Sequence, residues 1–270
     1  MPTATNGSIE IYYDIIGTGD PVMLITGLGG AGRAWGDQVA RFSSVFVTAV
    51  PDHRGTGRSS KPRPYEEVNG ETRAYTVGGL AADMAATLRH IARGPAHVVG
   101  SSTGGAFAQV MALEHPDVVR SITLASSWAR ADDHFRHQFA ARKRMLAEAG
   151  PMAYTEVTAL FLYSPDYIRD RYAEVRAWCD SAADGTDPEI MAARIDMIVD
   201  HDTVGRLEKI DVPALVIVGA DDVCTPPALS RELADLIPAA EYVEMPGGHL
   251  IYKEHPDLFF EHVSSFIRRS

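Results

Sequence analysis

The sequence predicts a doubly wound α/β fold, with a mostly parallel sheet that carries helices on both faces. Short apolar segments recur along the chain, helical segments separate them, and the chain has 270 residues. Short apolar runs are typical of parallel strands buried on both faces, and strands that alternate with helices form βαβ units. We expect one α/β domain with an insertion, because this length lies near the upper limit for a single hydrophobic core.

The predicted strands are of two kinds. Residues Ser8 to Ile15 alternate apolar and polar side chains, which predicts an antiparallel strand at the edge of the sheet. The later runs are nearly continuously apolar and predict buried parallel strands, except for the last run, which predicts a short strand. They are Val22 to Thr26, Val45 to Val50, Ala96 to Gly100, Ile122 to Ala125, Ala214 to Val218 and Tyr242 to Glu244.

Helical periodicity occupies the intervals between these strands. The predicted helices are Ala34 to Phe42, Val77 to Ile91, Thr103 to His115, Ala228 to Leu236 and Pro256 to Ile267. The alternation is interrupted once, between Trp128 and Lys209, where roughly four helical segments follow one another without a strand. We therefore expect a helical cap at residues 128–209, inserted into a core formed by residues 1–127 and 210–270.

Composition and charge exclude several classes of partner. The formal net charge is −11, and the basic residues form no run that could neutralise consecutive phosphates, so nucleic acid is not an expected partner. The N-terminal residues lack a signal-peptide pattern, and no apolar run approaches the ~20 residues of a membrane span. We expect a cytoplasmic protein without membrane contact. Cys179 and Cys224 lack the spacing of a metal site or a redox pair, so we expect neither a metal nor a disulfide.

One serine occupies a sharp turn between a strand and a helix. The segment Gly100-Ser101-Ser102-Thr103-Gly104 follows an apolar strand and opens a helix of small residues, which is the context of a nucleophile elbow. The two glycines leave room for the chain to reverse at the central serine. Ser102 is the candidate nucleophile, and the N–H of Thr103, at the start of the helix, is a candidate oxyanion donor. For Ser101 a local hydrogen bond is the better explanation.

A catalytic serine needs a base, and the base needs a carboxylate that fixes its tautomer. His249 follows the last strand on a glycine turn, which makes it the candidate base. Asp221 and Asp222 both lie on the loop after the strand Ala214 to Val218, and either could orient the histidine. The order Ser, Asp, His, with each residue after a strand, predicts a hydrolase that uses a serine nucleophile and no organic cofactor.

These segments make the chain similar to the α/β-hydrolase superfamily over essentially its whole length. The resemblance includes Thr26 to Gly30 as the oxyanion loop and Asp52 to Ser59 as the loop after the following strand. It implies an eight-stranded, mostly parallel sheet, selects Asp222 as the acid, and assigns the second oxyanion N–H to Leu28. Thr26 departs from the family pattern, because many members have histidine before that glycine.

Among the subfamilies, the stretches Leu24 to Trp35 and Trp128 to Tyr163 resemble most the aminoacrylate hydrolase of bacterial pyrimidine degradation, and next the enol-lactonases of aromatic catabolism. The resemblance implies a small acyl substrate: an ester, an enol lactone, or an enamine or carbamate acid. Arg130, where the cap begins, is a candidate clamp for a substrate carboxylate, and Trp128 is a candidate substrate contact. A salt bridge to a nearby cap carboxylate is the alternative for Arg130.

Two other function classes are open at this point. The segment from Gly27 to Gly32 also matches G-x-G-x-x-G after a strand, and Asp52 ends the next strand, as in a nicotinamide-dependent oxidoreductase. A strand before these glycines and the lack of a Tyr-x-x-x-Lys pair argue against that class. The second alternative is a noncatalytic ligand receptor on a hydrolase scaffold. For the hydrolase itself, direct attack by water with His249 as base is the alternative to an acyl-enzyme.

Overall fold

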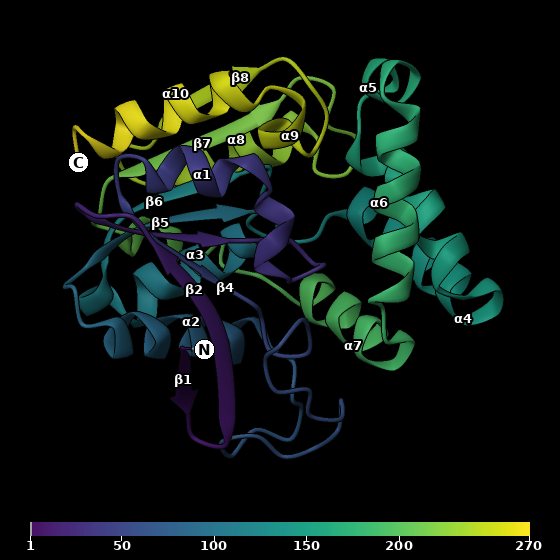
Figure 1. Cartoon of the computed structure of the whole chain (residues 1–270), viewed down its shortest axis with the longest axis horizontal. Coiled ribbons are helices and arrows are strands. Elements are labelled where there is room, and N and C mark those ends of the chain that lie inside the picture. The colour runs from purple at the N-terminus through teal and green to yellow at the C-terminus, as the bar shows by residue number, and fades with distance from the viewer. Residues whose placement is uncertain (1) are drawn as a thin grey trace.

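The central sheet is mostly parallel, as the sequence predicts. The structure is a computed structural model that describes residues 2–270, and within this range the sheet has eight strands in the order β1-β2-β4-β3-β5-β6-β7-β8 (Figure 1). From β4 onward in this order, neighbouring strands run parallel. The strands are β1 (Thr3–Asn6), β2 (Ile9–Ile16), β3 (Pro21–Ile25), β4 (Val47–Pro51), β5 (Ala96–Ser101), β6 (Val119–Ala125), β7 (Ala214–Gly219) and β8 (Glu241–Met245).

The predicted edge strand is antiparallel but does not lie at the edge. β2 pairs with β4 on one side and with β1 on the other, in the register Thr3↔Tyr12 to Asn6↔Ile9. β1 has only four residues, of which Ala4 alone is buried, so its sequence carries too little apolar pattern to predict a strand. The prediction of an edge position was therefore wrong, because pairing with β1 covers that side of β2.

Helices cover both faces of the sheet and enclose two apolar cores (Figure 1). On one face lie α1 (Asp37–Ser43) and α10 (Pro256–Ile267). On the other lie α2 (Val77–Ile91), α3 (Thr103–Glu114) and α8 (Pro227–Leu236). The buried strands supply side chains to both cores in alternation, as a strand between two helical layers must.

Two helical details differ from the sequence prediction. The predicted helix from Ala34 to Phe42 is divided into the 3₁₀ turn η1 (Gly32–Trp35) and α1, because Gly36 between them has φ 52° and ψ −128°. Helix α9 (Ile251–Glu254) was not predicted, since four residues are too short to show helical periodicity. Two further 3₁₀ turns, η2 (Pro116–Val118) and η3 (Leu207–Lys209), complete the connections.

Four helices follow one another between β6 and β7 and lie at one end of the sheet (Figure 1). They are α4 (Asp133–Leu162), α5 (Pro165–Asp170), α6 (Tyr172–Asp184) and α7 (Pro188–Val199). Within α4 the helix is interrupted at Gly150, whose φ is 81°, directly before Pro151. We call residues 128–209 the cap, although the boundary between core and cap stays a prediction.

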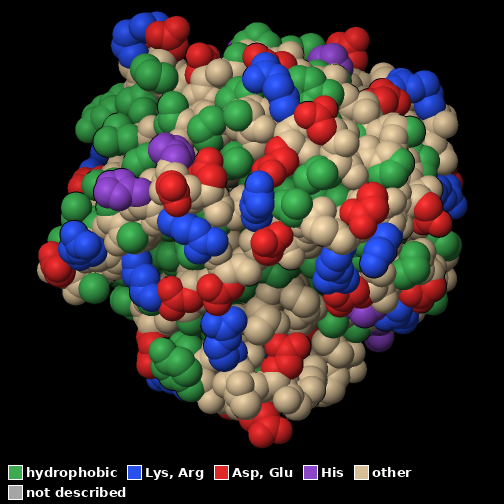
Figure 2. All heavy atoms as spheres, turned by 180° about the vertical axis from the view of Figure 1, so that it is seen from behind, with side chains coloured by type: hydrophobic (Ala, Val, Ile, Leu, Met, Phe, Trp, Pro, Cys, Tyr) green, Lys and Arg blue, Asp and Glu red, His purple; other side chains and the backbone are tan. Residues whose placement is uncertain are grey.

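The surface carries interspersed charges of both signs. On the face shown in Figure 2, Lys and Arg side chains alternate with Asp and Glu side chains, without a continuous basic stripe. In residues 2–270, no helix combines the length and apolarity needed to cross a membrane. The cytoplasmic location stays a prediction.

Candidate active site

Ser102 lies at the sharp turn between β5 and α3, where the sequence predicts a nucleophile elbow. Its backbone has φ 54° and ψ −116°, a conformation that few residues other than glycine adopt. A Cβ atom on Gly100 would lie 2.2 Å from the carbonyl oxygen of Gly104, and one on Gly104 would lie 2.2 Å from that of Ile25. Only glycine fits at both positions. The chain can therefore turn sharply at Ser102, which has the strained backbone geometry expected of a nucleophile elbow.

His249 and Asp222 meet in a buried contact beside this turn. His249 Nδ1 lies 2.8 Å from Asp222 Oδ2, and their side chains are 2% and 0% exposed. Asp222 also accepts hydrogen bonds from the backbone N–H groups of Cys224 and Thr225 and from the Thr225 hydroxyl, each at 2.9 Å. These donors satisfy a buried carboxylate and hold it toward the imidazole. Asp221 is exposed, and among the described residues the hydrogen-bond partners of the His249 ring are Asp222 and Thr225.

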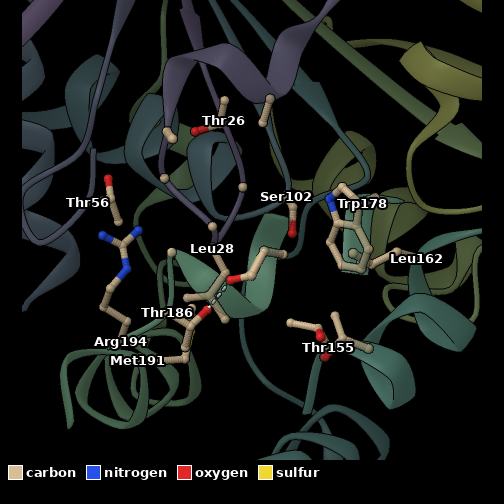
Figure 3. Close-up of a pocket in the computed structure, with 18 of the residues that line it drawn as sticks. Thr26, Leu28, Thr56, Ser102, Thr155, Leu162, Trp178, Thr186, Met191 and Arg194 are labelled. Carbon is tan, nitrogen blue, oxygen red and sulfur yellow. Dashed lines mark hydrogen bonds between the residues drawn. The ribbon is translucent and has the colours of Figure 1, made fainter. Parts of the chain in front are cut away.

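The candidate nucleophile and the candidate base reach the same cavity. Ser102 and His249 both line it, and the Ser102 hydroxyl points into it between Leu28 and Trp178 (Figure 3). No hydrogen bond joins the Ser102 hydroxyl to the imidazole in residues 2–270, although both side chains line the cavity. Such contacts in hydrolases often close only when a substrate is bound.

The predicted oxyanion donors flank Ser102 on two sides. A Cβ atom on Gly27 would lie 3.3 Å from the Cβ atom of Ser102, so the loop after β3 passes directly against this serine. Leu28 follows on this loop and lines the cavity, while Thr103 is the first residue of α3. Within residues 2–270, neither of their N–H groups donates to a backbone carbonyl. Both donors are therefore available to an oxygen atom bound near Ser102.

A buried network that the sequence did not reveal lies behind the oxyanion loop. Thr26 Oγ1 is 3.4 Å from His53 Nε2, and Arg194 on α7 donates from Nη2 to His53 Nδ1 at 2.9 Å. Burial and the Arg194 charge hold the pKa of His53 well below its ordinary value, so the imidazole is neutral and accepts at Nδ1. Arg194 Nη1 also donates to the carbonyl of Arg54 at 2.7 Å. Arg194 of the cap helix α7 thus contacts His53, which lies beside Thr26 at the start of the loop that carries Leu28.

The cavity has a volume of about 670 Å³ and is lined by residues of both the core and the cap (Figure 3). Volumes of this size are typical of sites for small organic ligands. The cap supplies apolar and hydroxyl side chains, among them Thr155, Leu162 and Trp178. Among the described lining residues, the charged side chains are mostly cationic: they are one carboxylate, Asp187, and the cations Arg33, Lys61, Arg142, Arg194 and Lys253.

The structure does not bring the predicted substrate contacts Arg130 and Trp128 to this cavity. The Arg130 side chain is 56% exposed and pairs with Glu232 at 3.2 Å, a partner from α8 and not a cap carboxylate. Trp128 is buried against Phe135, with ring centroids 4.6 Å apart. The cavity contains Arg142 instead, which sequence reasoning missed. Its signal is helical spacing, since Phe135, Gln138, Phe139 and Arg142 lie on one buried face of α4.

Comparisons with known proteins agree with this fold and site. A family model described as alpha/beta hydrolase fold matches residues 20–153. A relative from Azorhizobium caulinodans named "Putative carbamate hydrolase RutD" is 36% identical over 98% of both chains. The crystal structure of the enol-lactonase from Burkholderia xenovorans LB400 superposes with a TM-score of 0.89 at 27% identity, covering 99% of this chain and 100% of the other. A thermophilic esterase from Thermogutta terrifontis, determined with malate bound, gives 0.85 at 25% identity, covering 99% and 97%.

These relatives and neighbours are hydrolases by name, and they match the chain over nearly its full length. The glycines after β3 therefore belong to a hydrolase loop and not to a nicotinamide site, and the noncatalytic alternative is set aside as well. The predicted class and fold are confirmed. The chain belongs to the α/β-hydrolase family, and it is an enzyme of that family.

Proposed function

We propose that this enzyme hydrolyses a small acyl compound with Ser102 as nucleophile, His249 as base and Asp222 as the orienting acid. The substrate would be an ester, an enol lactone, or an enamine or carbamate acid. The observation that carries the proposal is the buried contact of 2.8 Å between His249 Nδ1 and Asp222 Oδ2, beside the cavity into which Ser102 points. Residues 128–209 would act as the cap that closes this cavity over the substrate.

The proposed reaction has two steps. His249 Nε2 removes the Ser102 proton, and Ser102 Oγ attacks the substrate carbonyl carbon, while the N–H groups of Leu28 and Thr103 stabilise the oxyanion. The imidazolium then gives its proton to the leaving group, and the acyl group stays on Ser102. In the second step His249 activates a water molecule, which releases the acid. No step calls for a metal or an organic cofactor, so we expect full activity after dialysis against a chelator.

The substrate class is supported by three independent features. Relatives are named "Putative carbamate hydrolase" and a structural neighbour is named an enol-lactonase, and a carbamate and an enol lactone both contain a carbonyl group. The cavity volume suits a small molecule. The charged side chains of its lining are mostly cationic in a protein whose net charge is −11, which favours an acidic substrate over a neutral one.

The decisive experiment compares Ser102→Ala with Ser101→Ala on p-nitrophenyl acetate and on a small enol lactone. Ser102→Ala should lose activity by several orders of magnitude and keep its thermal melting temperature, because triad residues act as a unit. Ser101→Ala should retain most of the activity. Mass spectrometry of the wild type during turnover should show acetylated Ser102. If Ser102→Ala stays active, the nucleophile is wrongly assigned, and an active enzyme without the adduct would favour direct attack by water.

A further inference from the structure

Arg142 lies on α4 at the cavity and has no acidic partner. Its side chain is buried, with 3% of the residue exposed. Nε donates to Thr158 Oγ1 at 3.2 Å, and Nη1 donates to Cys224 Sγ at 3.8 Å. In residues 2–270 no carboxylate lies within ion-pair distance of this guanidinium. Nη2 makes no hydrogen bond there either, so it is open to a ligand in the cavity.

All the groups that contact Arg142 are neutral. Burial raises the pKa of the Cys224 thiol to about 12, so this sulfur is not a thiolate at neutral pH. The rings of Phe139, Tyr154 and Phe161 lie 4.3, 5.6 and 5.6 Å from the guanidinium carbon. Aromatic faces attract a cation, but they carry no net charge that could neutralise it.

A buried cation without a counter-ion is costly, because removal from water is not offset by an opposite charge. Another buried arginine, Arg54, has a carboxylate counter-ion within the chain. It pairs with Asp83 at 2.7 Å, and both side chains are at most 2% exposed. Arg142 lacks such a carboxylate, although the protein has 36 acidic residues against 25 basic ones. Its counter-ion is therefore expected to come from outside the protein.

The position of Arg142 places that anion in the site described above. Arg142 lines the same cavity as Ser102 and His249. Asp187 is the only carboxylate in the described lining. It caps the start of α7, where it accepts hydrogen bonds from the N–H groups of Glu189 and Ile190. Arg194, the other fully buried cation of the described lining, has both Nη atoms occupied by His53 and Arg54, whereas Lys253 is only partly buried.

We propose that Arg142 is the specificity-determining residue of this enzyme, and that its guanidinium holds a carboxylate or carbamate group of the substrate while Ser102 attacks a carbonyl in the same molecule. The inference rests on the proposed function. Arginine suits this role because its planar fork binds a carboxylate with two hydrogen bonds and keeps its charge when desolvated. Because the anionic group takes no part in bond breaking, Arg142 acts mainly on substrate binding.

The test uses two substrates that differ only in charge. Monomethyl succinate carries a carboxylate and dimethyl succinate does not, while both have the same methyl ester and leaving group. Arg142→Met removes the charge and keeps most of the length, and Arg142→Lys keeps the charge without the fork. Arg144→Met is the matched control, because Arg144 is exposed on the same helix and does not line the cavity.

In the wild type we expect a clear preference for monomethyl succinate in kcat/KM. Arg142→Met should raise KM for monomethyl succinate by about 10- to 100-fold, as expected for a charge-assisted hydrogen bond, and leave kcat and the dimethyl ester nearly unchanged. Arg142→Lys should recover part of the loss, and Arg144→Met should behave as wild type.

Equal losses on both esters would overturn the proposal, as would a wild type without preference for the anion. If Arg142→Met does not fold, Arg142→Lys decides, because an unchanged preference in that variant would also refute the assignment. In either case, continued Ser102-dependent hydrolysis of dimethyl succinate would leave the proposed function intact. If neither ester is cleaved and a fluorophosphonate does not label Ser102, the proposed function itself is wrong.

Discussion

Replacing Asp222 with asparagine should abolish most of the activity, because the surrounding hydrogen bonds determine how the amide must lie. Asp222 Oδ1 accepts from the N–H groups of Cys224 and Thr225, both at 2.9 Å, whereas Oδ2 faces His249 Nδ1. In Asp222→Asn the two N–H donors require the amide oxygen at the Oδ1 position. The NH₂ group then occupies the Oδ2 position and points its hydrogens at the imidazole.

This orientation reverses the tautomer of His249. An NH₂ group next to Nδ1 requires that nitrogen to accept, so the ring proton moves to Nε2, which can then no longer take the Ser102 proton. Turning the amide over would leave two buried N–H groups facing an NH₂ group, at a cost of about 1–3 kcal/mol each. A loss of about 10⁴ in kcat is expected from the wrong tautomer, equal to about 5 kcal/mol of transition-state stabilisation.

The assay is steady-state hydrolysis of p-nitrophenyl acetate by wild type, Asp222→Asn and Asp221→Asn. Asp221 is the matched control, since it is the adjacent carboxylate but is exposed and does not contact His249. Urea denaturation of each variant checks that the fold is retained. If Asp222→Asn keeps more than a tenth of the wild-type kcat, or if both variants lose equal activity, the hydrogen-bond reasoning is refuted.

Three further predictions concern Arg194 behind the oxyanion loop, the exposed Arg130 and the buried His201. Arg194→Met should lower kcat by roughly tenfold with little change in KM, because the loop that carries Leu28 loses its tie to α7; an unchanged kcat would contradict this. Arg130→Met should leave KM for monomethyl succinate unchanged, since Arg130 pairs with Glu232 outside the cavity; a selective rise for the anionic ester would restore it as the clamp. Burial lowers the pKa of His201 from 6.5 to about 4, so between these values the unfolded chain binds more protons than the folded one and stability falls as pH decreases. From pH 7 to pH 5 His201 should contribute about 2 kcal/mol to the loss measured in urea denaturation, beside the contributions of the buried His53 and His97, so His201→Gln should lose about 2 kcal/mol less than the wild type; an equal loss in that variant would exclude His201 as a cause.

Local sequence predicted most of the elements and the turn that carries the candidate nucleophile. The helices Val77–Ile91 and Pro256–Ile267 have the predicted bounds, because a buried helical face is visible in the spacing of apolar residues alone. Ser102 was equally readable, since steric crowding at the turn excludes side chains from Gly100 and Gly104, which lie within two residues of it. The choice of Asp222 over Asp221 depended on resemblance to the family, because their spacing on the loop does not show which carboxylate turns inward.

Tertiary structure decided which side chains meet across long stretches of chain. Arg130 and Arg142 are twelve positions apart and are chemically identical, yet one lies in solvent beside Glu232 and the other lies in the cavity beside Cys224. Thr26 lies beside His53, whose other ring nitrogen is bonded by Arg194 of α7, more than a hundred residues later in the chain. Periodicity shows which face of a helix is buried, but the groups opposite that face depend on how distant segments pack. For that reason the sequence alone supported the candidate triad, while only the folded chain showed that Arg142 lines the same cavity.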